Sequence, residues 1–368
     1  MTTPAALGYR MPAEWEPHAA TWLAWPHERS DWPGKFAAIP WVYAEVVRHL
    51  VPGERVRILV GDAATERSAR RVLARSAVDL GRVDFFRVPT DRSWTRDFCP
   101  LFVRRDDGQV ALTNWKFNGW AKYPNWKRDD AVPDRLAKLL RRRQWKPGLV
   151  LEGGSIDVNG RGTLLTTEEC LLSPVQARNP GMERAAVERA LHDYLGVRKV
   201  LWLGRGIAGD DTHGHVDDLA RFVDARTVVV ASEEDPTDPN YDPLRENRER
   251  LARMTDQDAA PVRVVELPMP APVVFDGERL PASYANFYVA NAAVLVPTFN
   301  DPRDRQALET LAELFPGRRV VGIHAVDLVL GLGTLHCMTQ QEPAGSPRGG
   351  ESAPGLTGIG ASPLERMM

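Results

Sequence analysis

The chain has 368 residues, and its 47 basic side chains nearly balance its 49 acidic ones. This balance argues against a nucleic-acid-binding surface, which needs an excess of basic residues. Three widely separated cysteines form neither a disulfide framework nor a zinc-ligand spacing, and they fit a reducing cytoplasm. Because no signal pattern opens the sequence and no apolar run is long enough to span a membrane, we expect a cytoplasmic protein without a membrane partner.

Along the chain, an amphipathic helix repeatedly precedes a short strand, and a polar loop then leads to a second strand. Apolar residues with a period of 3.6 predict the helices, and short β-branched runs predict the strands. The predicted helices span residues 64–77, 133–143, 182–195, 243–254 and 304–314. The strand pairs that follow them span residues 83–88 and 101–103, 149–154 and 163–166, 199–202 and 220–223, 262–266 and 284–289, and 319–323 and 333–339.

Five comparable units indicate an α/β fold with radial repetition, that is, a five-bladed propeller with a pseudo-fivefold repeat. A doubly wound open sheet is the competing prediction, but no glycine-rich phosphate-binding motif opens a helix after a strand. We predict one domain over residues 1–343. Residues 344–368 are rich in Gly, Ser and Pro and are predicted to form a flexible tail.

The first candidate site segment is Trp-Thr-Arg-Asp at residues 94–97, in the loop before a predicted strand. Asp97 could hold a cationic substrate, with Trp94 lining the pocket. A local ion pair that fixes the loop is the alternative. Cys99, directly before a proline, is interpreted as structural.

Two further polar residues interrupt apolar stretches. Glu152 follows an apolar strand and precedes two glycines, and a carboxylate in that setting needs a partner. It could hold a histidine or a substrate nitrogen, or form a salt bridge at the rim of the sheet. Asn286 lies between aromatic residues, where a hydrogen bond to substrate and a hydrogen bond within the core are equally good explanations.

Residues 211–218, Asp-Thr-His-Gly-His-Val-Asp-Asp, are the densest cluster of titratable groups. If the segment is extended, His213, His215 and Asp217 share one face. That arrangement suits a metal site or an acid/base histidine beside a carboxylate. A polar turn capped by its first residues is the structural alternative. The histidines that could complete a metal site lack ligand spacing; they are His27, His324 and His336.

Cys337 lies where a glycine-broken apolar strand leads into a Thr-Gln-Gln run. A nucleophilic cysteine needs polar partners, and Gly333 would let a substrate approach the backbone closely. A buried structural thiol is the alternative. His215 could stabilise the thiolate and protonate a departing amine. His336 is expected to face away from the site, because adjacent strand residues point to opposite faces.

These groups together suit a guanidine substrate. Carboxylates at Asp97, Glu152 and Asp217 could hold a planar guanidinium, whose forked N–H groups match carboxylate oxygens. Cys337 would attack the electrophilic carbon, and His215 would protonate the leaving amine.

The sequence resembles the agmatine deiminase family, which includes the bacterial Porphyromonas-type peptidylarginine deiminases. The matching stretches occur in order from residue 9 to about 343. They are residues 10–18, 24–26, 94–97, 117–120, 152–154, 211–217, 284–288 and 336–341. Departures from the family pattern at residues 331–335, 98–100 and Asp218 concern substrate identity more than reaction type, because they remove no catalytic group.

The resemblance implies a pentein fold with the site on the axis of the propeller. It implies that Cys337 forms an amidino-cysteine intermediate and that His215 is the general acid/base. It also implies that Asp97 and Asp217 bind the guanidinium. Glu152 matches a family position near the histidine, and Asn286 matches a substrate-contacting position. The predicted catalytic residues are Cys337, His215, Asp217, Asp97 and Glu152, and the predicted substrate-binding residues are Asp97, Asp217, Trp94, Asn286 and Gly333.

The predicted function is therefore hydrolysis of agmatine to N-carbamoylputrescine and ammonia, with no metal or organic cofactor, and the resemblance implies a homodimer. One alternative is a deiminase of peptidyl-arginine or free arginine that forms citrulline. Two others belong to different classes: a non-catalytic binding protein for cationic amines, and a metal-dependent hydrolase.

Overall fold

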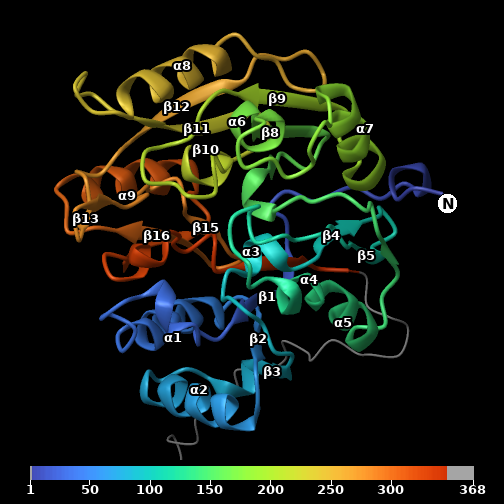
Figure 1. Ribbon diagram of the computed structural model, residues 1–368. Helices are drawn as coiled ribbons and strands as arrows, with labels where there is room; N and C mark the ends of the chain where they lie inside the picture. The colour runs from blue at the N-terminus through green and yellow to red at the C-terminus, as the bar shows by residue number, and fades with distance from the viewer. Residues whose placement is uncertain (1, 346–368) are drawn as a thin grey trace, which may run out of the picture.

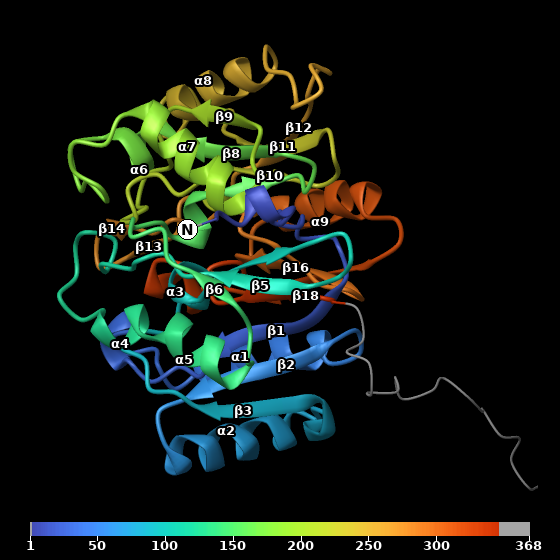
Figure 2. The same ribbon diagram turned by 90° about the vertical axis from the view of Figure 1, so that its right-hand side faces the viewer.

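The protein is described by a computed structural model that covers residues 2–345 (Figure 1). Five small sheets surround the centre of the molecule, and helices cover their outer sides (Figures 1 and 2). The predicted five-bladed α/β propeller is therefore confirmed. Residues 346–368, most of the predicted tail, lie outside the described residues, so the domain boundary at residue 343 stays a prediction.

Each blade repeats one strand order, in which the first strand is antiparallel to the second and the second is parallel to the third. In four blades the three strands follow one another along the chain. They are β4 (Leu101–Arg104), β5 (Val110–Thr113) and β6 (Gln144–Trp145); β7 (Asp157–Val158), β8 (Thr163–Thr167) and β9 (Lys199–Leu203); β10 (Ala220–Phe222), β11 (Thr227–Ser232) and β12 (Arg263–Pro268); and β15 (Tyr288–Val289), β16 (Ala293–Thr298) and β17 (Arg319–His324).

The remaining blade joins the two ends of the described chain. It consists of β18 (Gln340–Pro343), β1 (His18–Ala24), β2 (Arg55–Val60) and β3 (Val83–Arg87), in that order. β18 pairs antiparallel with β1, and the Trp22 indole donates a hydrogen bond to Glu342 at 3.0 Å. This closure places the segment that carries Cys337, directly before β18, beside the first blade.

Parallel neighbours need a crossover connection, and helices provide it in every blade. The crossover helices are α1 (Ile39–Leu50) and α2 (Ala63–Arg75) in the first blade, and α5 (Val132–Leu139), α7 (Arg184–Leu195), α8 (Tyr241–Leu251) and α9 (Arg303–Leu314) in the others. Shorter elements are α3 (Thr95–Phe98), α4 (Lys127–Asp130), α6 (Glu168–Leu172) and the hairpin of β13 (Val274–Phe275) and β14 (Glu278–Arg279). None of the helices in residues 2–345 has both the length and the apolar character of a membrane span.

The helices form where local sequence favours them. In α7 the buried residues Val187, Leu191 and Leu195 recur every four positions, which puts them on one face of the helix. The helix ends at Gly196, which has a φ of 70° and closes the last turn.

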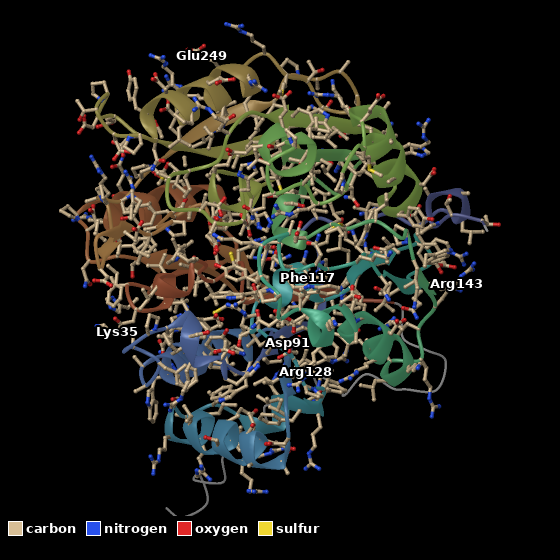
Figure 3. All side chains as sticks on the ribbon, in the orientation of Figure 1. Lys35, Asp91, Phe117, Arg128, Arg143 and Glu249 are labelled. Carbon is tan, nitrogen blue, oxygen red and sulfur yellow. The ribbon has the colours of Figure 1, made fainter. Side chains whose placement is uncertain are left out.

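Charged side chains such as Glu249 and Arg143 project from the periphery, whereas Phe117 is buried (Figure 3).

Two predicted strands are wrong and one is shortened. Residues 149–154 are not a strand, because the third strand of that blade is β6, and Val150 makes only an isolated bridge to Lys116. Residues 284–289 contribute only the two residues of β15. The predicted helix at 133–143 is also shorter, since α5 ends at Leu139 and Arg141 adopts a φ of 50°.

The second incorrect strand is the one that was predicted to carry Cys337. Residues 335–338 form a turn, in which the Met338 N–H donates to the Thr334 carbonyl. The amide of Asn286 explains the turn: its Oδ1 accepts from the Thr334 hydroxyl at 2.7 Å and from the His336 N–H at 3.0 Å. Because Asn286 is 48 residues from Thr334, this tertiary contact could not be read from the local apolar pattern.

Candidate active site

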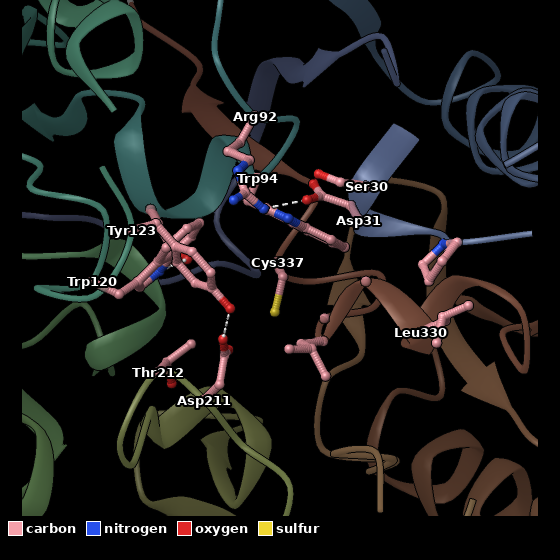
Figure 4. Close-up of a pocket in the computed structure, with 15 residues that line it drawn as sticks. Ser30, Asp31, Arg92, Trp94, Trp120, Tyr123, Asp211, Thr212, Leu330 and Cys337 are labelled. Atoms are coloured by element: carbon pink, nitrogen blue, oxygen red, sulfur yellow. Dashed lines mark hydrogen bonds and ion pairs between the residues drawn. The ribbon is translucent and has the colours of Figure 1, made fainter. Parts of the chain in front are cut away.

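A cavity of about 370 Å³ opens beside Cys337, and loops from several blades enclose it (Figure 4). Four of the predicted site residues line it directly: Trp94, Asp97, Gly333 and Cys337. The other lining residues are Ser30, Asp31, Pro33, Arg92, Trp120, Tyr123, Asp211, Thr212, Leu330, Gly331 and Leu332. The cavity is therefore the candidate active site.

The Cys337 thiol points into this cavity (Figure 4) and is 6% exposed. Its Sγ accepts a hydrogen bond from Asn286 Nδ2 at 3.1 Å and lies 3.8 Å from Asp217 Oδ2. Burial, followed by the carboxylates of Asp217, Asp218 and Asp97, raises the pKa of the thiol well above its ordinary value. The free protein therefore holds a neutral thiol, and a cation must enter the cavity before the thiolate is favoured.

Glycine at two positions makes room for the thiol and the aromatic wall. A Cβ at Gly333 would lie 3.0 Å from both the Cys337 Cβ and the Trp94 ring. A Cβ at Gly331 would lie 2.7 Å from the rings of Trp32 and Trp94. The groups that come close to the Gly333 backbone are thus the side chains of Cys337 and Trp94. Contact between Gly333 and the substrate stays a prediction.

Asp97 is held by neighbours on both sides of its carboxylate. Oδ1 accepts from the Gly154 N–H at 3.0 Å, and Oδ2 accepts from the Trp120 indole at 2.9 Å. Its helix α3 is tied to the cysteine turn, because the Arg96 N–H donates to the Cys337 carbonyl at 3.1 Å. Burial raises the pKa of Asp97 to about 6, since the repulsion from Asp217 and Glu152 offsets much of the attraction to His215.

Asp217 lies in the 3₁₀ turn Val216–Asp218, and His336 supports it from behind. Asp217 Oδ2 is 2.6 Å from His336 Nδ1, and His336 Nε2 is 2.8 Å from Glu14 Oε2. Burial favours the neutral acid, but the hydrogen bond and charge of His336 outweigh it and lower the pKa of Asp217. His336 is a buried, hydrogen-bonded histidine as predicted, although the strand argument behind that prediction was wrong.

His215 lies between the two aspartates and is 1% exposed. Its Nδ1 is 3.9 Å from Oδ1 of Asp97 and 3.9 Å from Oδ1 of Asp217. Burial opposes the charged ring, yet Asp97, then Cys170, then Asp217 raise the pKa of His215 well above its ordinary value. At neutral pH the ring is therefore an imidazolium, the protonation state that a general acid needs.

Gly154 lets these charged groups converge. A Cβ at this position would lie 2.6 Å from His215 Nδ1, 2.9 Å from Asp97 Oδ1 and 3.0 Å from Asp217 Oδ2. Any side chain here would push the histidine and the carboxylates apart. The Gly-Gly pair after Glu152 thus has a steric reason that its sequence context alone did not reveal.

Glu152 is fully buried, and its Oε1 accepts from Arg178 Nε at 2.9 Å. A salt bridge was one of the predicted roles of Glu152. The observed one lies inside the protein and not at the rim of the sheet. Oε2 has no hydrogen-bond partner among the described residues. A Glu152 oxygen, the Cys170 thiol and a ring nitrogen of His215 lie within 4.8 Å of one another, so the predicted proximity to the histidine is also present.

Asn286 does not line the cavity, because both ends of its amide are used inside the protein. In addition to its contacts with the cysteine turn, its Nδ2 donates to Asp218 Oδ1 at 2.9 Å. Its observed place is behind the thiol, and its predicted contact with substrate stays a prediction.

His213 adopts a φ of 64°, and its Nε2 lies 3.2 Å from the Ser173 hydroxyl. The predicted shared face of His213, His215 and Asp217 therefore does not form.

The outer half of the cavity contains charged residues that sequence reasoning missed or treated as turn caps. Asp31 forms an ion pair with Arg92, and burial raises the pKa of Asp31 to about 6 despite that pair. The Tyr123 hydroxyl donates to Asp211, and Lys122 Nζ lies 3.2 Å from the same carboxylate (Figure 4). Only the position of Asp211 next to the histidine motif could have drawn attention to this region.

Comparisons with known proteins agree with this geometry. A family model described as Porphyromonas-type peptidyl-arginine deiminase matches residues 10–343. The agmatine deiminase of Pseudomonas aeruginosa is 35% identical, and the match covers 93% of this chain and 98% of that protein. The solved structure of the Enterococcus faecalis agmatine deiminase has a TM-score of 0.85 at 34% identity and covers 94% of this chain and 98% of that one. A C. jejuni agmatine deiminase with substrate bound has a TM-score of 0.83 at 31% identity and covers 92% and 97%.

Proposed function

The chain belongs to the Porphyromonas-type peptidyl-arginine deiminase family, and from this premise we propose that it is an agmatine deiminase. It hydrolyses agmatine to N-carbamoylputrescine and ammonia. The observation that carries the proposal is the convergence of the Cys337 thiol, Asp97, Asp217 and His215 beside a cavity that the carboxylates of Asp31 and Asp211 also line.

The cavity suits a substrate with a cation at each end. Asp97 lines the cavity, and Asp217 lies behind it, 3.8 Å from the Cys337 sulfur, with an Oδ1 that has no hydrogen-bond partner among the described residues. A guanidinium can donate paired N–H bonds to such carboxylates. At the outer end, Asp31 and Asp211 can receive the primary ammonium of agmatine.

The same charges disfavour free arginine. Its α-carboxylate would approach Asp31 and Asp211 and would need a cationic partner. Among the described residues that line the cavity, Arg92 is the one cationic side chain, and it is already paired with Asp31. Agmatine lacks the carboxylate, so it avoids this repulsion.

Binding activates the nucleophile. A guanidinium placed between Asp97 and Asp217 brings a positive charge next to the Cys337 sulfur, which lowers the thiol pKa, so that the thiol proton passes to solvent. The thiolate then attacks the guanidinium carbon, and an S–C bond forms. His215 gives its proton to one terminal nitrogen, the C–N bond breaks, and ammonia leaves.

Water completes the reaction. The neutral His215 accepts a proton from water as the oxygen attacks the thiouronium carbon. The S–C bond breaks, the remaining hydroxyl proton passes to the departing thiolate and restores the thiol, and the released ammonia takes up the proton that the thiol had given to solvent. The product is a ureido compound, and Asp97 and Asp217 keep the reacting carbon beside the sulfur throughout.

The test measures ammonia and ureido product from agmatine, free arginine and an arginine-containing peptide, with wild type and Cys337→Ala in parallel. We expect turnover of agmatine alone and none in the variant. Turnover of the peptide alone would replace the proposal with a protein-modifying function. Agmatine turnover that persists in Cys337→Ala would contradict the thiol mechanism.

We further propose a homodimer that acts in the cytoplasm. The resemblance to the family supports the dimer. The unpaired state of Cys99, Cys170 and Cys337 supports a reducing compartment. Sedimentation equilibrium of the purified protein and fractionation of cells that express it would test the two statements, and a monomer or an extracellular product would contradict them.

A further inference from the structure

Cys170 is a buried thiol that the proposed chemistry does not use. It lies in the short helix α6 and is 1% exposed. Its sulfur lies within 4.8 Å of a ring nitrogen of His215 and of a carboxylate oxygen of Glu152. The thiol therefore adjoins the general acid on a side that the cavity does not reach.

The segment that carries Cys170 also fixes the backbone of the histidine loop. The Thr167 hydroxyl donates to the Gly214 carbonyl at 2.6 Å and accepts from the Cys170 N–H at 3.0 Å. Glu169 Oε2 accepts from the Gly206 N–H at 2.6 Å. Gly214 has a φ of 92°, and a Cβ there would lie 2.9 Å from the Glu169 carboxylate. The packing of α6 and the loop thus determines where Cys170 and His215 meet.

The His215 ring is asymmetric in its surroundings. Nδ1 is turned toward Asp97 and Asp217, and a ring nitrogen also lies within 4.8 Å of the Cys170 sulfur and of a Glu152 oxygen. Glu152 is partly committed, because Arg178 binds its other oxygen. Neither ring nitrogen makes a hydrogen bond of ordinary geometry within residues 2–345. The ring depends on these longer contacts for its orientation.

We propose that Cys170 is a positioning residue of the reaction: its thiol holds the Nε2 side of the His215 imidazolium, so that Nδ1 faces the departing nitrogen. The inference rests on the proposed function for its catalytic consequence, although the contact with His215 exists without it. Cys170 touches no substrate, and it acts only through the histidine.

The electrostatic surroundings of His215 also support this role of Cys170. The groups that interact with His215 are Asp97 from α3, Asp217 and Asp218 from the turn Val216–Asp218, Glu152, and Cys170 from α6. Burial disfavours the imidazolium, and Cys170 acts with Asp97 and Asp217 to raise the pKa of His215. Removal of the thiol should therefore lower that pKa, so that the protonated acid is lost at a lower pH.

The kinetic experiment compares wild type with Cys170→Ala, Cys170→Ser and the control Cys99→Ala. Cys99 is also a buried cysteine, but it lies outside the His215 cluster. In Cys170→Ala we expect kcat to fall about tenfold, because the acid is less well aligned, with little change in KM. The alkaline limb of the kcat profile should move to lower pH. The near-isosteric Cys170→Ser should recover part of the lost kcat and part of the shift of the alkaline limb. Cys99→Ala should keep the wild-type profile.

A second measurement is independent of substrate. The ring of His215 is titrated by NMR with ring-labelled histidine, and the variant His215→Gln identifies its signal among the eight histidines. The midpoint should be lower in Cys170→Ala than in wild type. An unchanged midpoint together with an unchanged alkaline limb would overturn the proposal, and so would equal losses of kcat in the Ala and Ser variants without a pH shift, which would indicate packing alone.

The two proposals can fail separately. If wild type does not turn over agmatine, the proposed function fails, and the NMR midpoint still decides whether Cys170 acts on His215. If wild type turns over agmatine and both Cys170 readouts stay at wild-type values, only the positioning proposal fails. If Cys170→Ala does not fold, the same comparison is made with Cys170→Ser.

Discussion

At the residue scale, the site depends on carboxylates that are buried close to one another. Such groups are costly unless partners compensate them. Asp97 has two N–H donors and a neighbouring imidazolium, and Asp217 has His336. The substrate supplies the remaining positive charge, and this explains why binding and activation of the thiol are linked.

The variant Asp97→Asn tests the guanidinium contact. The amide removes a charge and turns an N–H donor toward either Gly154 or Trp120, both of which donate to Asp97 in the native protein. We expect kcat/KM for agmatine to fall at least about a hundredfold, because a charged hydrogen bond in a closed site is lost. Steady-state kinetics measure the effect, and the exposed Asp107→Asn is the control. A loss below tenfold would show that Asp217 alone binds the guanidinium.

The two histidines differ in what they do, and pH profiles distinguish them. His336 lowers the pKa of Asp217, so without it Asp217 stays protonated up to a higher pH. We therefore expect His336→Asn to move the acid limb of kcat/KM upward while activity returns at higher pH. His215→Ala should remove most activity at every pH, because His215 is the group proposed to protonate the leaving nitrogen. The opposite pattern would mean that the roles of the two residues are exchanged.

At the scale of elements, short irregular segments carry the chemistry, and regular strands and helices hold them. The 3₁₀ turns Gly153–Ser155 and Val216–Asp218, the helix α3 and the turn at residues 335–338 all meet at the site. Each lies shortly before the first strand of a different blade. Loops on a rigid scaffold commonly carry function in this way.

The variant Gly154→Ala tests how tightly these segments meet. Its Cβ would come within 3.0 Å of His215, Asp97 and Asp217, so at least one of them must move. We expect kcat to fall at least about tenfold, since small displacements of catalytic groups are costly. The control is Gly317→Ala, where no atom lies within 4 Å of the added methyl group. Equal kinetics for the two variants would contradict the crowding that the structure shows.

At the scale of the whole molecule, a buried polar network joins the blades behind the site. Glu14 binds the guanidinium groups of Arg96 and Arg221, the ring of His336 and the Val289 N–H. These partners belong to widely separated parts of the chain, so one carboxylate links the cysteine turn to three other segments. Burial opposes the charge on Glu14, but these cations outweigh it and keep the pKa of Glu14 well below its ordinary value.

This network makes a prediction about acid stability. A carboxyl group whose pKa is lower in the folded state contributes stability above its unfolded pKa and loses it as the pH falls through the folded pKa. We expect Glu14→Gln to lower the free energy of unfolding at pH 7 by about 3 kcal/mol, as for other broken buried ion pairs. Urea denaturation measures the difference, which should shrink in acid, where wild type loses the same contribution.

The control for this measurement is Glu309→Gln. Glu309 pairs with Arg305 on the surface, where the two side chains are 61% and 85% exposed. Solvent screens such a pair, so the variant should remain close to wild type at every pH. Equal losses for the two variants would show that the buried network does not hold the blades together.

The amino-acid sequence by itself determined the repeating pattern and the identity of the reactive groups. Helix periodicity is local, because apolar residues such as Val187, Leu191 and Leu195 face one side whatever lies opposite. The five units, and hence the propeller, followed from it. The set of Cys337, His215, Asp97 and Asp217 followed from residue chemistry and from the resemblance to a family.

Only the tertiary structure decided how those groups are arranged. The turn at Cys337 replaces a predicted strand because Asn286 binds its backbone from far away in the sequence. The place of β6, the Arg178 partner of Glu152 and the second thiol beside His215 likewise depend on contacts between distant segments. Hydrogen bonds and charges act over a few ångströms in space, and the local pattern of a sequence does not specify which distant residues come that close.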